Sequence, residues 1–317
     1  MIWLYAAQFA LPLILIGWLV WAPARTLLGF TVQVFGSFAA LVVMALQGIW
    51  LLPPWWVPFV FAVVTGLATW SGWRRIRPFP SVMPIAWGGW VVPVVFIALG
   101  AASGYGTVAA LRSRVAPAAG VVDLAFPLEA GRYLVVNGGS NSSTNAHLET
   151  LDISVPRYRA WRGQSYGVDL VALGKFGLRA SGVQPADPRA YRMYGARVLA
   201  PCAGQVVVAV DGLPDMQVPQ ADRKHLAGNH VLLRCADADV LLGHLQPGSV
   251  RLLAGTKVAA GDWLGLVGNS GNSGEPHLHI HAQGQGPTEE PLGGRPLHIK
   301  FNGRFLVRGD RIDTLCI

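Results

Sequence analysis

The first 114 residues of this 317-residue chain contain no Asp, Glu, Lys or His, and this absence constrains the fold more than any other feature. Their charges are six arginines, and ten of the 12 Trp lie among them. The remainder holds all 17 acidic residues, 19 of the 25 basic residues and all eight His. Only 13% of the whole chain is charged, against about 25% in soluble domains. The two parts therefore meet different surroundings. The composition excludes a disordered chain and disfavours a wholly soluble one.

The net charge of +8 follows largely from this acid-free part. A nucleic-acid-binding face needs Lys and Arg clustered on a soluble surface, and the sequence shows no such cluster. We therefore expect no nucleic-acid partner.

Residues 1–114 are predicted to form a helical membrane domain. About 20 apolar residues are needed to cross a bilayer as a helix, and the sequence has four uncharged stretches of about that length. These stretches are Ile2–Trp21, Leu27–Leu52, Trp55–Trp73 and roughly Trp87–Leu111. The stretches lack Asp, Glu, Lys and His, so an anchor in the lipid bilayer is favoured over a transporter or pump.

The arginines predict how the spans are oriented, because short cytoplasmic loops are rich in positive charge. With Arg25 and residues 74–77 inside, everything after Leu111 lies outside the cytoplasm, although Arg112 and Arg114 run against this pattern. We expect a multi-pass protein of the inner (cell) membrane with an extracytoplasmic or periplasmic domain at residues 115–317. A signal peptide ending at residues 22–24 is an alternative for the first stretch, but it lacks a basic n-region.

The external part is predicted to be a mostly antiparallel β domain. After a linker at residues 116–120, short apolar runs are separated by turn residues, as in β-rich domains. Two polar segments, Leu178–Tyr194 and Asp211–Ala227, are expected to be loops at the rim of a site. The expected strands are Tyr133–Val136, Gly167–Ala172, Gln205–Val210, His230–Leu233, Val240–Leu242, Trp263–Val267 and Leu278–Ala282.

The three cysteines allow one disulfide. Cys202 precedes one predicted strand and Cys235 ends another. In an oxidising compartment, we expect these two to pair and Cys316 to stay free.

The histidines point to a metal. In Pro276-His-Leu-His-Ile-His281, side chains on a strand alternate between faces, so His277, His279 and His281 share one face. A polar strand face open to solvent is the simpler explanation, but clustered histidines often bind metals. A catalytic zinc usually takes three N or O ligands and keeps one position for water. Asp169 and His244 interrupt other apolar runs, where a polar side chain needs a partner.

These segments together resemble the lysostaphin/LytM-type zinc metallopeptidases, over roughly residues 133–282. The resemblance rests on Gly243-His-Leu245, on the glycine-rich run from Gly255 to Gly274 and on Pro276-His-Leu-His279, which are similar to the family's "aHL", "V..G..iG..G.tG.s" and "PHLHF" segments. Residues 200–207 resemble an earlier family strand. The glycine-rich run alone also occurs in biotinyl and lipoyl carrier domains, but Lys257 does not lie on the tight hairpin that a carrier needs.

The resemblance implies a role for each matching residue. His279 and Asp169 would be zinc ligands, and His244 and His277 would be catalytic. The family's first ligand is a His four residues before the Asp, where this chain has Ser165, and serine is no replacement. Some relatives place this His after an Asn- and Gly-rich turn upstream. Residues 137–147 look similar, so His147 is predicted as the first ligand.

Two alternatives remain for the site. His147 could be a loop residue of a degenerate site, or His279 and His281 could form the pair in another register, although Pro276-His-Leu-His matches better. We expect His225, His230 and His298 to be structural or surface residues.

The resemblance implies a membrane-anchored zinc endopeptidase that hydrolyses cell-wall peptidoglycan peptides with a zinc-activated water. Which of His244 and His277 is the general base, and which stabilises the oxyanion, stays open. The alternative is a degenerate LytM-like protein that binds and regulates other wall hydrolases, which Ser165 keeps open.

Overall fold

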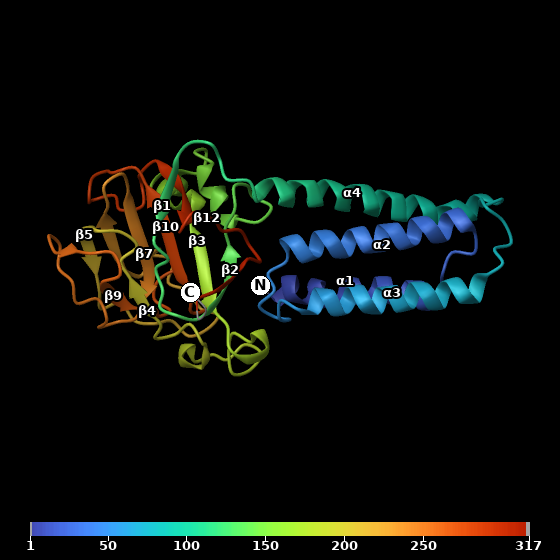
Figure 1. Ribbon diagram of the computed structural model, residues 1–317, viewed down its shortest axis with the longest axis horizontal. Helices are drawn as coiled ribbons and strands as arrows, with labels where there is room; N and C mark the ends of the chain where they lie inside the picture. The colour runs from blue at the N-terminus through green and yellow to red at the C-terminus, as the bar shows by residue number, and fades with distance from the viewer. Residues whose placement is uncertain (1, 315–317) are drawn as a thin grey trace. The chain divides into compact units, whose positions relative to one another are not determined.

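The computed structural model describes residues 2–314, and the chain divides into two compact units, Met1–Leu111 and Arg112–Ile317. The predicted boundary, between residues 114 and 115, lies three residues further along. Each unit has its own architecture (Figure 1).

The first unit is a set of four long helices joined by short turns. Each predicted apolar stretch contains one helix, and the helices end near the predicted turn residues. The Thr26 side chain caps the second helix by accepting from the Gly29 amide at 3.1 Å. Pro53 and Pro54 lie between the second and third helices, and Pro78 follows the third. The helices are α1 (Ile2–Trp21), α2 (Leu27–Gln47), α3 (Val57–Ile76) and α4 (Val91–Ser113), with the 3₁₀ turn η1 (Trp87–Trp90) before α4.

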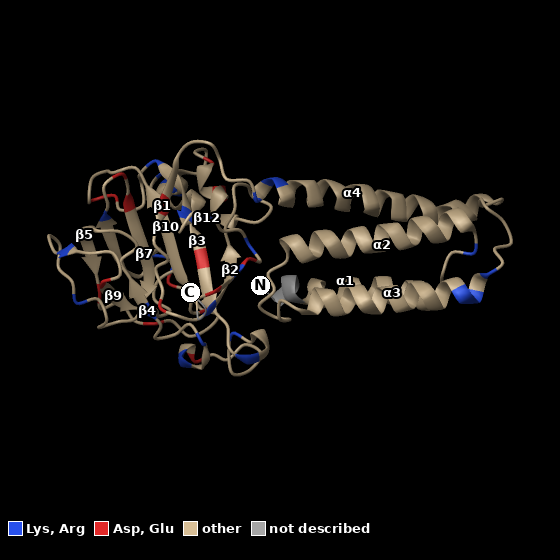
Figure 2. Ribbon diagram, viewed as in Figure 1, with Lys and Arg blue, Asp and Glu red and all other residues tan. Residues whose placement is uncertain are grey.

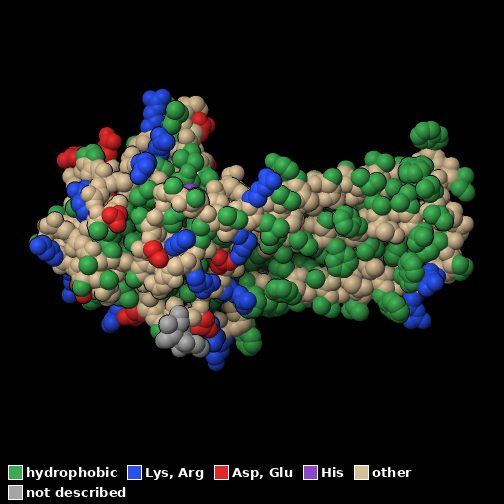
Figure 3. Space-filling view, turned by 45° about the horizontal axis from the view of Figure 1, so that its top comes forward, with side chains coloured by type: hydrophobic (Ala, Val, Ile, Leu, Met, Phe, Trp, Pro, Cys, Tyr) green, Lys and Arg blue, Asp and Glu red, His purple; other side chains and the backbone are tan. Residues whose placement is uncertain are grey.

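The helices of this unit pack through small clusters of buried residues and leave much apolar surface exposed. Leu15, Ala40 and Phe96 join α1, α2 and α4, and Gly36 is needed there because a Cβ would lie 2.6 Å from the Phe96 carbonyl oxygen. Large side chains such as Phe59 (65% exposed) point outward, and apolar side chains cover much of the helices on the face in Figure 3. Soluble monomers rarely expose so much continuous apolar surface.

Two helical segments, Leu27–Gln47 and Trp87–Ser113, are long and apolar enough to cross a membrane. Ala6–Trp21 is a shorter apolar helix. Residues 2–314 thus contain two candidate spans by length and composition. The arrangement with four spans stays a prediction.

The second unit is a β domain, in which all seven predicted strands occur with bounds close to those expected. The prediction missed the short strands and β11, which begins with a proline. The strands are β1 (Val121–Leu124), β2 (Arg132–Asn137), β3 (Val168–Ala172), β4 (Arg197–Leu199), β5 (Gly204–Val210), β6 (Asn229–Arg234), β7 (Asp239–Leu245), β8 (Lys257–Val258), β9 (Trp263–Leu266), β10 (Leu278–Gln283), β11 (Pro296–Phe301), β12 (Arg304–Phe305) and β13 (Arg311–Asp313).

Within the described residues, eleven strands form one sheet whose central order is β13-β2-β3-β10-β7-β6-β5-β8. Its pairings are antiparallel, as predicted, except that β1 runs parallel to β11. One face carries the hydrophobic core, to which Leu170, Leu242 and Ile280 contribute from the three central strands. The small β4–β9 sheet adds Val198 and Leu264 to this core.

The opposite face of the central strands is also covered, which the sequence did not predict. Residues 146–166 form η2 (Ala146–Leu151), α5 (Pro156–Arg159) and η3 (Arg162–Tyr166). Gly163 lies against the sheet so closely that a Cβ would meet the Gln283 side chain. His279 and His281 are consequently 3% and 0% exposed. The histidine face of β10 is therefore buried as well, and a solvated polar strand is excluded.

A disulfide joins Cys202 to Cys235, with their Cα atoms 6.1 Å apart, as the sequence predicted. It links the start of β5 to the end of β6, its neighbour in the sheet. Cys316, predicted to be free, lies outside the described residues.

Replacing both Cys202 and Cys235 by Ala should destabilise the β domain. The disulfide closes a loop between positions 33 residues apart, and removing such a cross-link lowers the free energy of unfolding by about 2–4 kcal/mol. Urea titration of the purified protein measures the loss, and Cys316→Ser is the control. Non-reducing peptide mass spectrometry should find the 202 and 235 peptides linked; two free thiols there would contradict the pairing.

Candidate metal centre

A row of residues crosses four strands of the sheet and forms the floor of the candidate site. Asp169 on β3 is the register partner of Asn137 on β2 and of His279 on β10, and His279 is in turn opposite Gly243 on β7. Adjacent strands lie about 4.8 Å apart, so residues in such a row are in side-chain contact. The sheet register therefore brings the carboxylate and the imidazole together from positions 110 residues apart.

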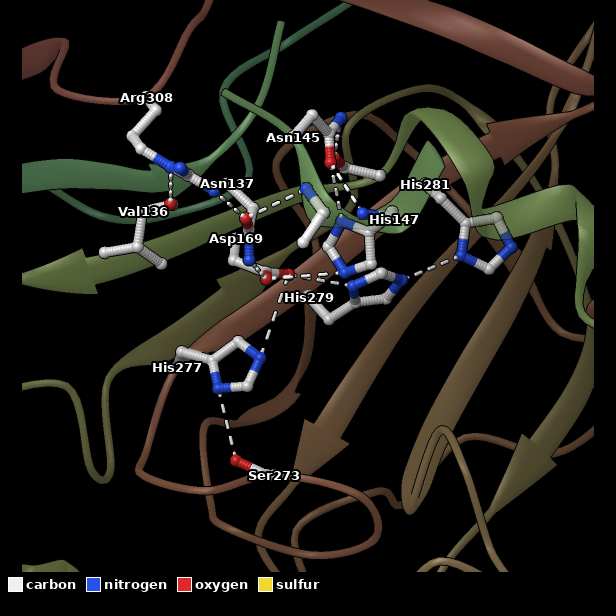
Figure 4. Close-up of polar contacts among 12 residues, drawn as sticks. Val136, Asn137, Asn145, His147, Asp169, Ser273, His277, His279, His281 and Arg308 are labelled. Atoms are coloured by element: carbon white, nitrogen blue, oxygen red, sulfur yellow. Dashed lines mark hydrogen bonds and ion pairs between the residues drawn. The ribbon is translucent and has the colours of Figure 1, made fainter. Parts of the chain in front are cut away.

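Three predicted ligands converge at this row (Figure 4). Asp169 lies 2.8 Å through Oδ1 from Nδ1 of His279 and 3.4 Å through Oδ2 from Nε2 of His147. One ligand atom from each residue lies within 4.8 Å of the other two. His147 reaches the site from η2, in the layer that covers this face of the sheet.

The hydrogen bonds of His147 define which of its nitrogens can bind a metal. Its Nδ1–H donates to Oδ1 of Asn145 at 3.0 Å, and its backbone amide donates to the same oxygen at 3.1 Å. The Asn145 amide group is itself held by donating to the Gly167 carbonyl at 3.1 Å. Nε2 of His147 is then the unprotonated nitrogen, and it faces Asp169. Burial lowers the pKa of His147 to about 4, so the ring is neutral at pH 7.

His279 is fixed from the other side by His281. Its Nδ1–H donates to Oδ1 of the ionised Asp169 at 2.8 Å, and its Nε2 hydrogen-bonds Nδ1 of His281 at 3.0 Å. The ring packs against the backbone of Gly167, where a Cβ would lie 2.7 Å from its Cε1 atom. His281 therefore lies behind His279 and does not face Asp169, which disfavours the register with His279 and His281 as the pair.

His244 and His277 lie together beside the three ligands, with ring centroids 4.6 Å apart. Nδ1–H of His277 donates to the Glu275 carbonyl at 2.8 Å, and Nδ1–H of His244 donates to the Ser270 carbonyl at 2.9 Å. Since a carbonyl can only accept, Nε2 of each ring is the acceptor atom of the neutral imidazole. Nε2 of His277 lies 3.7 Å from Asp169.

The backbone of His244 is left-handed, with φ 61°. This conformation is uncommon for a residue other than glycine and is often found at functional sites. Its carbonyl accepts from Gly268, and burial lowers the pKa of its ring well below the usual range.

Asp169 is a buried carboxylate whose charge is stabilised by its neighbours. Burial alone would raise its pKa, but the imidazoles around it hold the pKa well below the usual range. Asn137 donates to Oδ2 at 2.8 Å, and Arg308 in turn donates to Oδ1 of Asn137 at 2.8 Å. Burial lowers the pKa of Arg308 to about 10, so it remains protonated at pH 7. Asp169 thus has the partners that its place in an apolar run requires.

Ser165, at the position of the family's usual ligand, points elsewhere. It is fully buried, and its Oγ lies 2.8 Å from Oγ1 of Thr150 and donates to the Arg162 carbonyl. The bond to Thr150 joins η3 to η2, the turn that carries His147.

The other histidines lie outside this group, as expected. His225 is exposed and pairs with Asp222 at 2.7 Å. His298 stacks on Tyr166 with centroids 3.6 Å apart, and His230 is buried with Nδ1 on the Gly228 carbonyl.

Sequence reasoning missed four residues that shape the site, Asn137, Asn145, Gly167 and Arg308. Asn137 and Asn145 bound the Asn-rich turn that drew attention to His147, and Gly167 shares a strand face with Asp169. Arg308 had no sequence signal, because only the fold brings the C-terminal loop to β2.

The two long loops contact the segment that precedes β10. Asp215 accepts from the Asn269 amide at 2.6 Å, and Arg179 forms a buried ion pair with Glu275 at 2.9 Å. These contacts hold the segment that leads into His277.

Three comparisons with known proteins found similar sequences and structures. Over 63 residues, 20% of this chain, the sequence is 41% identical to Endolysin 2638A of Staphylococcus phage 2638A, but the match spans only 13% of that protein. Among solved structures, the catalytic domain of lysostaphin from Staphylococcus simulans is 20% identical over 41% of this chain and 74% of its own, with a TM-score of 0.27. A zinc-containing peptidase from Vibrio cholerae is 16% identical over 47% of this chain and 49% of its own, with a TM-score of 0.22.

Residues 190–291 match peptidase family M23, and this segment contains His244, His277 and His279 in the arrangement described above. The β unit of this chain therefore contains a peptidase M23 domain of the lysostaphin/LytM type.

Proposed function

We propose that the chain is a membrane-anchored zinc metalloendopeptidase that hydrolyses peptide bonds in peptidoglycan. The observation that carries this proposal is the convergence of His147, Asp169 and His279, each of which offers one ligand atom, next to a pair of imidazoles. Membership of residues 190–291 in the M23 family supports the reaction class and the wall substrate.

The three residues fit a zinc ion. Ligand atoms in a tetrahedral N/O zinc site lie about 3.3–3.5 Å apart, and Nε2 of His147 is 3.4 Å from Asp169. The 2.8 Å contact of His279 with Asp169 is a hydrogen bond that an ion would replace. A bound zinc supplies Lewis acidity, which polarises the scissile carbonyl and lowers the pKa of the attacking water.

His244 and His277 are suited to proton transfer. Each has its Nδ1–H held by a backbone carbonyl, so Nε2 can accept a proton from water or, once protonated, donate to an oxyanion. The side chain of His277 is 15% exposed, whereas His244 is a buried residue. We assign the general base to His277, because its Nε2 lies beside Asp169 and is more open to solvent, and the oxyanion donor to His244.

Two features, the placement of the arginines and the disulfide, support a location outside the cytoplasm for the peptidase domain. The arginines near α1 and α3 favour the cytoplasmic side, which sends the end of α4 outward if all four helices span. The Cys202–Cys235 disulfide is typical of an oxidising compartment. Both support an inner-membrane protein whose peptidase domain faces the wall.

A degenerate regulator of other wall hydrolases is the competing function. Ser165 favours it, because the usual first ligand is absent and Ser165 has no contact with Asp169 among its hydrogen bonds. The zinc content and the hydrolysis assay below separate the two functions.

His147→Ala should remove the metal. We expect about one zinc per wild-type chain by mass spectrometry, and less than a tenth of that in the variant after dialysis, because two ligands do not make a stable site. His225→Ala is the control, since that histidine is exposed and bonded to Asp222. Equal zinc in wild type and His147→Ala would remove His147 from the site.

Asn145→Ala should weaken zinc binding without removing a ligand. The hydrogen bond to Nδ1 selects the His147 tautomer, and loss of such a partner costs about 10–100-fold in metal affinity. Titration against a zinc-chelating dye measures the affinity. An unchanged dissociation constant in a folded variant would show that Asn145 does not position the ligand.

His277→Ala and His244→Ala should keep zinc but lose hydrolysis. Removal of a general acid or base lowers the rate by about 10²–10⁴-fold. New amine ends released from purified sacculi measure the rate, and a chelator should abolish it in the wild type. Zinc-loaded wild type that releases no amine ends would refute the peptidase and favour the regulator.

Reporter fusions should place the two ends of α4 on opposite sides of the membrane. Alkaline phosphatase fused after residue 115 should be active, and the same reporter fused after Arg77 should be inactive, because the enzyme matures only outside the cytoplasm. An inactive fusion at residue 115 would contradict the orientation inferred from the arginines.

A further inference from the structure

Arginines without carboxylate partners gather at one end of the helical unit. Arg25 follows α1, and Arg74, Arg75 and Arg77 lie at the end of α3 (Figure 2). The first acidic residue of the chain is Asp123, so the unit Met1–Leu111 offers these guanidinium groups no carboxylate at all. An anion from outside the unit is therefore the natural partner for them.

Two of these arginines line a cavity of about 570 Å³ between the ends of α1 and α3. Arg75 uses one nitrogen to donate to the Val20 carbonyl in the last turn of α1, which holds its side chain over the cavity. Arg25 lies in the wall as an exposed side chain. The remaining lining is formed by Trp21, Ala22, Pro23, Ile76 and Pro80.

A second cavity of about 570 Å³, shallow and open to the surface, runs along α1 and shares Trp21 and Ala22 with the first. Its other walls are Leu13, Ile14, Gly17 and Trp18, so it carries no charged side chain. The indole of Trp21 folds over Gly17, where a Cβ would lie 2.8 Å from its Cζ3 atom. One end of the combined surface is therefore cationic, and the rest is apolar.

We propose that these two cavities bind one anionic glycerophospholipid. Its phosphate lies between Arg25 and Arg75, because a guanidinium group matches phosphate oxygens with paired N–H donors. One acyl chain lies along the apolar face of α1 from Trp21 towards Leu13. Trp21, 83% exposed, is placed where an interfacial tryptophan meets the headgroup region.

The apolar half of the surface distinguishes a lipid from a soluble phosphate. Leu13 and Ile14 are 58% and 60% exposed, and a small anion would leave both uncovered. A lipid covers them and supplies the missing negative charge, which lies at the membrane surface where basic side chains attract anionic headgroups. The proposal rests on the helical unit lying in the bilayer, as proposed above.

Native mass spectrometry of the full chain in detergent tests the site. Wild type should retain phosphatidylglycerol at least tenfold more tightly than phosphatidylcholine of the same chains. Arg25→Gln/Arg75→Gln should abolish that preference. Arg74→Gln/Arg77→Gln removes the same charge from the same end of the unit without altering the lining of either cavity, so it should keep the preference. Equal loss in both double variants would show non-specific charge attraction and overturn the site.

Two further ligands test the phosphate contact and the acyl-chain contact separately. Glycerol 3-phosphate should not displace phosphatidylglycerol at equal concentration, and dihexanoyl phosphatidylglycerol should bind at least tenfold more weakly than the long-chain lipid. Competition by glycerol 3-phosphate would identify a phosphate site, and equal binding of short and long chains would refute the groove. Membrane fractionation of the same variants tests the location independently, because a protein absent from the membrane fraction fails there whatever lipid it retains in detergent.

Discussion

The buried carboxylate of Asp169 is the group on which the rest of the site depends. An ionised carboxylate in a sheet interior is costly unless it is paired and hydrogen-bonded. Here the sheet register supplies both kinds of partner, because Asn137 and His279 lie directly across from it on the two neighbouring strands. Removing any one partner would leave charge or dipole uncompensated in the same small volume.

Around that carboxylate, hydrogen bonds to other groups determine which ring nitrogen of three histidines carries the proton. His147, His244 and His277 each give their Nδ1 proton to an oxygen of Asn145, Ser270 or Glu275. His279 is held the opposite way round, through Nε2 on His281. In the neutral rings the three Nδ1 bonds leave Nε2 of His147, His244 and His277 as acceptors, whereas Nδ1 of His279 donates to Asp169. Such preset tautomers are what a metal ligand or a proton acceptor needs.

Much of this was readable from the sequence, for reasons that differ from residue to residue. Alternation along residues 277–281 fixes which histidines share a face, and a lone Asp169 in an apolar run demands a partner. Strand pairing is not encoded locally in the same way, so the contribution of Arg308 from the far end of the chain could not be predicted. Burial of the histidine face was also missed, because the covering layer at residues 146–166 consists of short turns without helical periodicity.

Ser165 shows how the site can keep its geometry although the family's usual ligand is absent. A histidine at position 165, on η3, would approach Asp169 from the segment directly before β3. In this chain the position instead carries a hydroxyl that bonds Thr150 on η2, and η2 is the turn whose second residue is His147. Asn145, which begins that turn, is tied to the Gly167 carbonyl just before β3. Ser165 thus helps to anchor the segment that carries His147, the ligand proposed in its place. A change at Ser165 should therefore act on the metal through the position of His147 rather than through a lost ligand.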